Sequence, residues 1–357
     1  MPSRYNSRNR KLRRQSTEAE PPMPTSNARI SVLGAGSWGT ALGILLARHG
    51  HQVSLWGHMA DEMTTLERDR ENKHYLPGVS FPKHLFPTAD LAKSISGTDE
   101  ILIAVPSHAF ASVLQQIKTL APSLRTLSWA TKGLEPAHQR LMSEVARETF
   151  PEADIAVVSG PTFAMEVAKG MPTAVTVASS SLEYAKRLAD YLHGETFRAY
   201  TSDDIIGVQV GGAAKNVMAI AAGMSDGLGF GANARAALIT RGLAEITRLG
   251  LALGGKHDTF MGLAGLGDLV LTCTDDQSRN RRMGLALASG HGIEEARKRI
   301  GQEVEGLAAA RDFRIKARDL GVEMPITEHV YRIIYKGLDP AVAVKTLLSR
   351  EQKPELG

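Results

Sequence analysis

The chain of 357 residues divides into two stretches with different patterns of hydrophobic and polar positions. Up to about residue 205, short apolar runs alternate with longer stretches whose apolar residues recur every three or four positions. This alternation predicts strands interleaved with helices. From Gly207 to about Leu348 only the helical period remains. We therefore expect a doubly wound α/β sheet followed by an all-helical half, with the change near residues 205–212.

The first strand and helix carry the most informative motif. The apolar run Ile30–Leu33 stops at glycines 34, 36 and 39, which are spaced GxGxxG, and a small-residue helix follows at once. In a Rossmann-type βαβ unit, Gly34 turns the chain, Gly36 admits a pyrophosphate and Gly39 lets the helix pack on the strand. The unit is completed by a helix over residues 38–49, a left-handed stop at Gly50 and a strand over residues 52–56. We therefore expect a dinucleotide site at this turn.

The end of the second strand bears on which dinucleotide binds there. Sites for NAD usually place an acidic residue at this point to hold the ribose 2′-hydroxyl. Here the strand ends at Trp56-Gly57-His58, and Asp61 and Glu62 follow a few residues later, where we expect the next helix. The pattern favours NADPH and allows NADH. His58 is equally well read as a neighbour of a 2′-phosphate or as a solvated loop residue.

Further strands follow along the first half. We expect strands over residues 100–106, 125–130, 155–158 and 173–178, a short extended piece over 197–201, and helices over 107–120 and 182–192. The strands expected over residues 125–130 and 155–158 end at the turns 131–133 and 159–162. Because ligands of doubly wound sheets lie outside the carboxyl ends of the strands, these turns should border one crevice.

Composition limits the remaining possibilities. The net charge is +4, but residues 1–29 carry seven basic and two acidic side chains, which leaves 35 basic and 36 acidic residues beyond them. We interpret this Pro-containing basic head as a disordered extension over residues 1–28 and allow it a weak contact with nucleic acid or an anionic surface. No signal peptide or run of 18 apolar residues is found, and Cys273 is the only cysteine. The pattern predicts a cytoplasmic protein with no specific nucleic-acid site and no transmembrane segment.

In the helical half, Lys215 and Asn216 interrupt a helix that otherwise consists of small apolar residues. Such a helix should be buried on nearly all sides. Because a buried lysine is costly unless it is paired or functional, we favour a functional Lys215 over a purely structural ion pair. We expect Asn216 to cap or orient its neighbours.

A second polar cluster follows a glycine-rich loop. Asp268 comes after three glycines and before an apolar run, where it could face a cavity and pair with a lysine. Ser278-Arg279-Asn280 offers a hydroxyl, a guanidinium and an amide, a combination suited to an anionic phosphate. Arg281 and Arg282 are explained by a charged helix face.

Taken in order, seven segments of the chain resemble the bacterial type of the NAD(P)-dependent glycerol-3-phosphate dehydrogenase family. They are GAGSWGTAL from Gly34, VPSHAF from Val105, ATKGLE from Ala130, SGPTFAMEVAKG from Ser159, GGAAKNV from Gly211, GANARAALITRGLAEITRLG from Gly231, and GLAGLGDLVLTCT from Gly262 with SRNRR after it. The resemblance implies reversible reduction of dihydroxyacetone phosphate to sn-glycerol 3-phosphate, which supplies phospholipid synthesis. Hydride passes from NAD(P)H, and no metal is expected.

The resemblance also implies roles for individual residues, with Lys215 as the general acid and base. Contacts to the glycerol phosphate fall to Lys132, Gly160, Thr162, Lys215, Asp268, Ser278, Arg279 and Asn280. The dinucleotide is expected to face Gly34, Gly36, Ser37, Trp38, Gly39, His58, Lys132, Ala164, Arg279 and Glu305. The chain departs from the family pattern at Met59, Met165, Ala232 and Glu303.

Two other functions remain possible from the residues themselves. One is a two-domain dehydrogenase that acts on a 3-hydroxy acid or a sugar acid, and the other is a redox sensor that binds a dinucleotide without turnover. We expect a dinucleotide-binding domain over residues 29–206 and a helical substrate and catalytic domain over residues 207–350. Small-residue faces such as 223–231 suit close helix packing within or between subunits, and a homodimer is expected.

Overall fold

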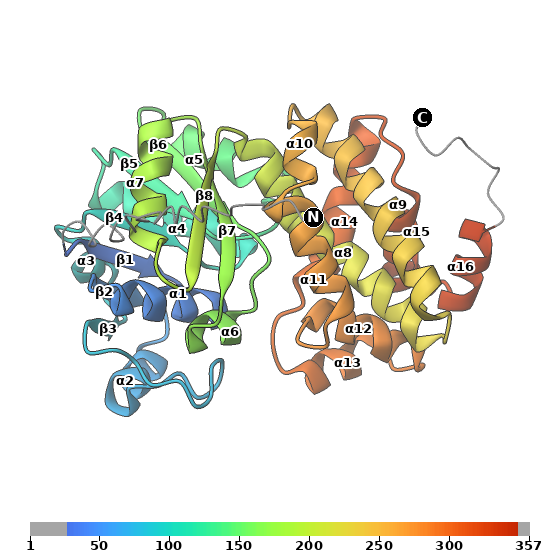
Figure 1. The fold of residues 1–357 in the computed structure, drawn as a ribbon, viewed down its shortest axis with the longest axis horizontal. Coiled ribbons are helices and arrows are strands. Elements are labelled where there is room, and N and C mark those ends of the chain that lie inside the picture. Colours follow the sequence, from blue (N-terminus) through green and yellow to red (C-terminus); the bar gives the residue numbers. More distant parts are fainter. Residues whose placement is uncertain (1–26, 349–357) are drawn as a thin grey trace, which may run out of the picture.

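The computed structural model describes residues 27–348, and the predicted disordered extension, residues 1–28, lies outside them except for its last two residues. Within the described residues, eight strands form a single sheet in the order β3-β2-β1-β4-β5-β6-β7-β8 (Figure 1). Their bounds are β1 Arg29–Leu33, β2 Gln52–Trp56, β3 Leu85–Thr88, β4 Glu100–Ile103, β5 Thr126–Trp129, β6 Asp154–Ser159, β7 Thr173–Ser179 and β8 Phe197–Ser202. The predicted doubly wound sheet is therefore confirmed.

Helices cover both faces of this sheet. Their bounds are α1 Ser37–Arg48, α2 Ala60–Asp69, α3 Leu91–Ile95, α4 Ser107–Leu120, α5 Met142–Thr149, α6 Ala164–Lys169 and α7 Leu182–Leu192. Apolar residues of α1, α6 and α7 form one buried cluster with the strands, whereas those of α3, α4 and α5 form another. The two clusters explain why the central strands are buried along their whole length, as the continuous apolar run of β4 predicts.

Most expected elements of this half occur within one to three residues of their predicted bounds. The expected helix over residues 107–120 matches α4 at both ends. The strand β3 and the short helices α3, α5 and α6 are absent from the expected elements. The short extended piece over 197–201 is a full strand, β8, parallel to β7. The chain also reverses direction between β6 and β7, which pair antiparallel, whereas all other neighbouring strands are parallel.

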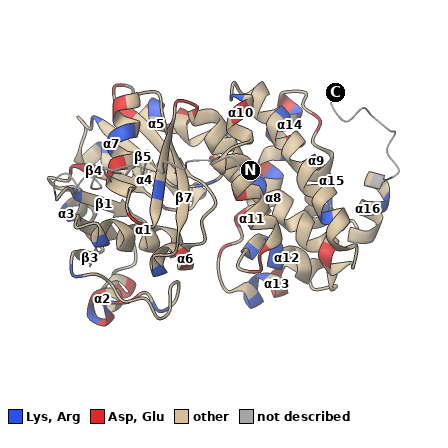
Figure 2. Cartoon of the chain, in the orientation of Figure 1, with Lys and Arg blue, Asp and Glu red and all other residues tan. Residues whose placement is uncertain are grey.

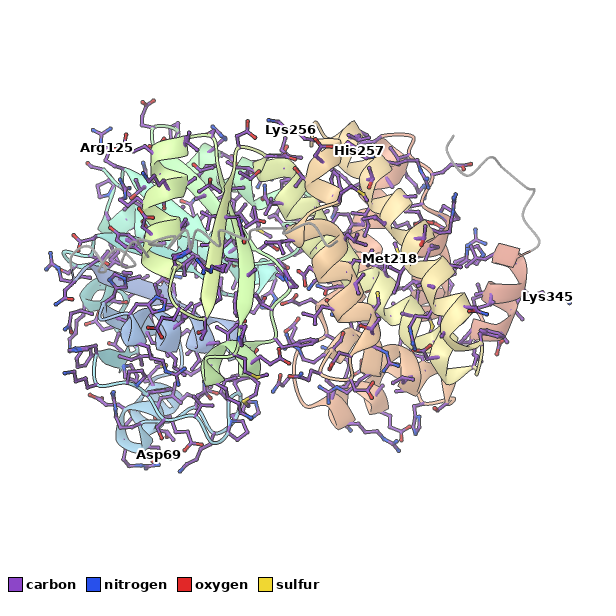
Figure 3. All side chains as sticks on the ribbon, viewed as in Figure 1. Asp69, Arg125, Met218, Lys256, His257 and Lys345 are labelled. Atoms are coloured by element: carbon purple, nitrogen blue, oxygen red, sulfur yellow. The ribbon has the colours of Figure 1, made fainter. Side chains whose placement is uncertain are left out.

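From Ile205 onward the described residues form helices only. These are α8 Ile205–Gly227, α9 Gly231–Ala252, α10 His257–Phe260, the π-helical turn η1 Leu263–Gly267, α11 Asp268–Thr274, α12 Arg279–Ala288, α13 Ile293–Ile300, α14 Glu305–Asp319, α15 Pro325–Lys336 and α16 Pro340–Leu348. The expected all-helical half is confirmed. Met218 of α8 lies in its interior (Figure 3), with no exposed surface.

The helix α8 is the core of this half. It is long and apolar enough to span a bilayer by length and composition, but 94% of its most apolar window is buried among its neighbours. The helix α12 packs tightly against α8: Gly284 of α12 lies so close to α8 that a side chain there would collide with the carbonyl oxygen of Ile220. Gly223 and Gly227 of the predicted small-residue face also pack against α12, so they serve contacts within the chain. Figure 2 shows basic and acidic residues interspersed over both halves.

Candidate active site

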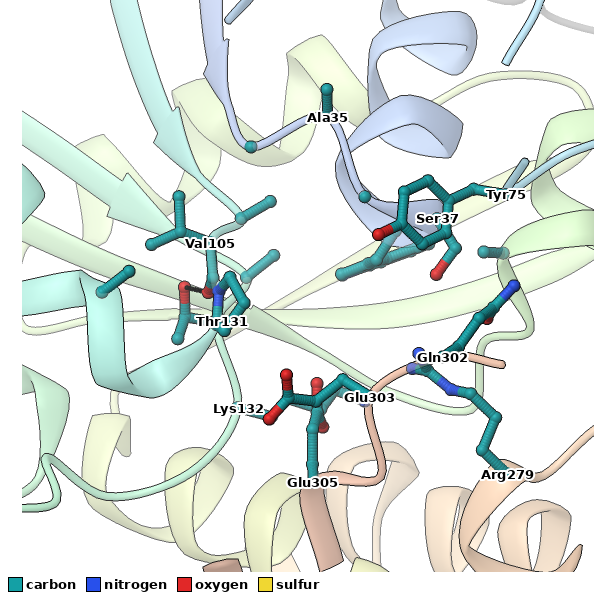
Figure 4. Close-up of a pocket in the computed structure, with 18 of the residues that line it drawn as sticks. Ala35, Ser37, Tyr75, Val105, Thr131, Lys132, Arg279, Gln302, Glu303 and Glu305 are labelled. Atoms are coloured by element: carbon teal, nitrogen blue, oxygen red, sulfur yellow. Dashed lines mark hydrogen bonds between the residues drawn. The ribbon is translucent and has the colours of Figure 1, made fainter. Parts of the chain in front are cut away.

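A cavity of about 630 Å³ lies where the carboxyl ends of β1, β4 and β5 face the first turns of α12 and α14. Figure 4 shows Ala35 and Ser37 on one side of it, with Arg279, Gln302 and Glu303 on the other. The cavity therefore lies between the sheet and the helical half. This is the position at which doubly wound sheets bind their ligands.

The glycine turn has the geometry that a dinucleotide phosphate needs. Gly34 has φ of 125°, and a side chain there would meet the carbonyl oxygen of Ala104, while one at Gly39 would collide with Gly34. By contrast, a side chain at Gly36 would meet no atom within 4 Å. No side chain caps the start of α1, and the indole Nε1 of Trp38 is buried without a hydrogen-bond partner. Open space and unsatisfied donors at a helix N-terminus fit a bound pyrophosphate.

The end of β2 contributes a different set of groups. His58 is exposed and lines the cavity, together with Tyr75 of the segment that follows α2. Glu62 lies on α2, beyond the end of β2 as expected, and it also lines the cavity. The reason is that α2 starts directly at the mouth of the site. Tyr75 was not anticipated, because nothing in its local sequence marks it.

Two lysines share one buried carboxylate at the centre of the site. Asp268, at the start of α11, has no exposed surface and accepts a hydrogen bond of 2.8 Å from Nζ of Lys132. Its other oxygen accepts a hydrogen bond from Nζ of Lys215, which also donates to the hydroxyl of Thr272 at 2.9 Å. The expected burial of Lys215 and the expected pairing of Asp268 with a lysine are confirmed. Thr272 was missed because its position depends on the turn of α11.

The two lysines differ in protonation. Burial, joined by the positive charge of Lys132, lowers the pKa of Lys215 to about 8 against the opposing effect of Asp268. Burial also disfavours the charged form of Lys132, but the Asp268 carboxylate outweighs it and raises the pKa of Lys132 above its ordinary value. Lys132 therefore stays charged, whereas Lys215 can gain or lose a proton near neutral pH.

A chain of amides connects the helices around these lysines. Asn216 donates to Glu305 at 3.1 Å and accepts a hydrogen bond of 3.0 Å from Asn280. Asn280 in turn accepts from the backbone N–H of Gly306. The hydroxyl of Ser278 caps α12 by accepting from the N–H of Arg281. The expectation that Asn216 orients its neighbours is confirmed, because it joins α8, α12 and α14.

The arginines of α12 divide into two kinds. Arg281 is buried and ion-paired with Asp226, at 2.7 Å, and with Asp276, so the interpretation of Arg281 as part of a solvated charged face was wrong. Asp226 lies at the end of α8 and is close to Arg281 only in the folded chain. Arg279 and Arg282 instead line the cavity.

Most predicted site residues meet in this one cavity. Those that line it are Gly34, Gly36, Ser37, Trp38, His58, Lys132, Thr162, Ala164, Lys215, Ser278, Arg279, Asn280 and Glu305. Gly39, Gly160 and Asp268 do not line it. Asp268 acts on the cavity through the two lysines that it holds. The arrangement provides a proton donor beside cationic groups suited to a phosphate, and within residues 27–348 no cluster of His, Cys, Asp and Glu is placed to hold a metal ion.

Comparison with known proteins matches both halves. The family model for the NAD-dependent glycerol-3-phosphate dehydrogenase N-terminus matches residues 29–185, and the model for the C-terminus of the same family matches residues 204–345. The glycerol-3-phosphate dehydrogenase (NAD(P)+) of Pseudoalteromonas translucida is 55% identical over 335 residues, which are 93% of this chain and all of that protein. The crystal structure of glycerol-3-phosphate dehydrogenase from Coxiella burnetii has a TM-score of 0.89 at 48% identity and covers 91% of this chain and 99% of its own.

Proposed function

The chain belongs to the NAD-dependent glycerol-3-phosphate dehydrogenase family, and from that premise we propose how its residues reduce dihydroxyacetone phosphate to sn-glycerol 3-phosphate. It is an oxidoreductase that uses a nicotinamide cofactor. A bound NAD(P)H supplies the hydride that adds to the carbonyl carbon. The chain's own residues must bind the phosphate, orient the ketone and deliver one proton to its oxygen.

We propose that Lys215 delivers that proton. The observation that carries this assignment is a buried ammonium with a pKa near 8, held by Asp268 at the edge of the cavity. As the carbonyl carbon gains hydride, the oxygen becomes negative, takes a proton from Nζ and leaves a neutral amine. In the reverse direction the amine must start neutral, which about one molecule in ten satisfies at pH 7. Reduction is therefore the easier direction at neutral pH.

The remaining roles follow from position. The phosphate of the substrate is assigned to Arg279, with Ser278, Asn280 and Thr162 around it, and Lys132 and Asp268 hold Lys215 in place. This remote phosphate fixes the reacting carbon. The dinucleotide is assigned to the glycine turn with Ser37, Trp38, His58, Ala164 and Glu305. We propose NADPH as the preferred cofactor, with NADH accepted, since no carboxylate ends β2 itself.

Several wider properties are proposed with this activity. The dinucleotide-binding domain comprises residues 29–206 and the substrate domain residues 207–350. The enzyme acts in the cytoplasm and supplies glycerol phosphate for phospholipid synthesis. We further propose a homodimer, supported by an apolar groove of about 1380 Å³ between α9, α15 and α16 and by the exposed side chains of Phe230 and Val342 beside it. Sedimentation of the full chain as a monomer would contradict this.

The decisive experiment compares Lys215→Met with Lys256→Met. Lys256 is an exposed lysine outside the cavity. With dihydroxyacetone phosphate and NADPH or NADH, Lys215→Met should lower kcat at least about a thousandfold, because it removes the proton donor. Its dissociation constant for NADPH should stay within about twofold, and Lys256→Met should behave as the parent. Normal turnover by Lys215→Met would refute the assignment, whereas turnover of 3-hydroxy acids alone would refute the substrate.

A further inference from the structure

The cavity wall formed by α12 carries two arginines without a counter-charge. Arg279 and Arg282 both line the cavity, and neither guanidinium forms an ion pair or hydrogen bond with another side chain or backbone group in the described range 27–348. Their neighbour Arg281 shows the contrast, because it is paired with two aspartates. Figure 4 shows Arg279 extending toward Gln302 and the side of the cavity that holds Ser37. Of the three arginines of α12, Arg281 is therefore neutralised by ion pairs within the protein, whereas Arg279 and Arg282 face the cavity.

Arg282 is more than a solvated charge. Its side chain is half-buried, and its Nε is fully buried without a partner. Burial, together with the adjacent Arg279, lowers the pKa of the Arg282 guanidinium. A partly desolvated cation beside a second cation is unfavourable unless an anion joins them. The geometry therefore indicates that an anion belongs between α12 and the opposite wall.

The course of α12 indicates which anion this is. Its first turn touches Asn216, next to Lys215, but Gly284 already packs against Ile220, and Ala288 packs against Gly227 at the far end of α8. Each turn of α12 thus leads away from the proton donor. Arg282 lies about 4.5 Å beyond Arg279 along the helix axis and on the same face. A three-carbon phosphate ester held between Lys215 and Arg279 does not extend as far as Arg282, whereas a dinucleotide continues along the cavity past Arg279.

We propose that Arg282 binds a phosphate group of the dinucleotide from the helical side of the cavity. This inference rests on the proposed function, since a dinucleotide must occupy the site. The planar guanidinium matches phosphate oxygens in pairs, and the open space at Gly36 leaves room for the pyrophosphate on the opposite wall. A phosphate held from both walls would join the sheet and the helical half around the cofactor.

The test measures binding of NADPH and NADH separately by fluorescence titration, without substrate, in Arg282→Gln. Arg297→Gln is the control, because Arg297 is an exposed arginine of α13 that does not line the cavity. We expect the dissociation constant to rise about tenfold in Arg282→Gln and less than twofold in the control. Equal weakening of both nucleotides identifies the pyrophosphate, and weakening of NADPH alone identifies the 2′-phosphate. Arg282→Lys should recover part of the affinity.

Two results would overturn the proposal. One is unchanged binding of both nucleotides and an unchanged KM for dihydroxyacetone phosphate in Arg282→Gln. The other is a raised KM for the substrate with unchanged nucleotide binding, which would assign Arg282 to the substrate phosphate. Melting temperatures of both variants, which should equal that of the parent, exclude misfolding as the cause. If the parent protein itself bound neither nucleotide, the proposed function would fail first.

Discussion

Replacing Asp268 with asparagine tests the electrostatic account of the site most directly. Asp268 has no exposed surface, and both of its oxygens accept hydrogen bonds from lysines, with 2.8 Å to Lys132. Asparagine keeps the shape and one acceptor but removes the negative charge. The change leaves Lys215 buried beside a second cation, so its neutral form becomes favoured.

The size of the effect follows from the geometry. At an effective dielectric constant of about 20, two unit charges about 4 Å apart interact by about 4 kcal/mol. Since 1.36 kcal/mol corresponds to one pH unit, the loss of this attraction would move the titration of Lys215 by at most about three pH units. Relaxation and entering water reduce that figure, so we expect one to two. At pH 7 about half to nine-tenths of Lys215 would then be neutral, and reduction would slow about two- to tenfold.

The assay is the pH dependence of kcat for ketone reduction between pH 5 and 9.5. Because the proposed reaction needs protonated Lys215, the parent rate should fall as pH rises through about 8, the pKa of Lys215. In Asp268→Asn the fall should occur at least about one pH unit lower, with partial recovery of the rate at pH 5.5. Asp203→Asn, at an exposed ion pair with Lys256, should leave the profile unchanged. An unmoved midpoint in Asp268→Asn would refute the reasoning.

Two further substitutions test the cofactor turn and the sheet. Gly36→Ala should weaken NADPH binding at least about tenfold while changing the free energy of unfolding by less than about 1 kcal/mol, because the extended backbone accepts alanine and the new methyl group enters only the open cavity. Gly292→Ala, at an equally open helix start, is the control. Unchanged NADPH affinity in Gly36→Ala would count against the phosphate site. Burial raises the pKa of Glu100 to about 7, above its ordinary 4.5, although the hydroxyls of Tyr184 and Ser128 donate hydrogen bonds to the carboxylate. The contribution of protonated Glu100 to the free energy of unfolding is therefore present at low pH and is lost as pH rises from about 4.5 through 7. Chemical denaturation should show that Glu100→Gln removes a pH-dependent loss of about 3 kcal/mol between pH 5 and 8, and an identical pH dependence in the parent and the variant would contradict this.

Features carried by local patterns could be predicted from the sequence. The GxGxxG turn, the buried strands and the lysine in an Ala-rich helix each depend on neighbours within a few residues, and the structure agrees with all three. The strand β3 escaped prediction because it is four residues long and contains Pro87, a residue that normally argues against a strand. It is tolerated because β3 lies at the edge of the sheet.

Features that depend on distant partners could not be predicted. Arg281 looks like a surface residue until Asp226, 55 positions earlier, is brought beside it. Glu62 and Tyr75 line the cavity because of the path that the chain takes after β2, which periodicity does not encode. Likewise, the apolar patterns of β6 and β7 do not indicate that these two strands pair antiparallel. In each case tertiary contacts decide the outcome.

The placement of Lys215 in the middle of α8 has a consequence for protein engineering. The helix that carries the proposed proton donor is also the one that most of the helical half packs around, and 94% of its most apolar window is buried. A substitution that enlarges one of its alanines would shift the amine as well as the packing. Attempts to raise heat resistance by filling space around α8 should therefore cost turnover, whereas changes on the outer helices leave more freedom.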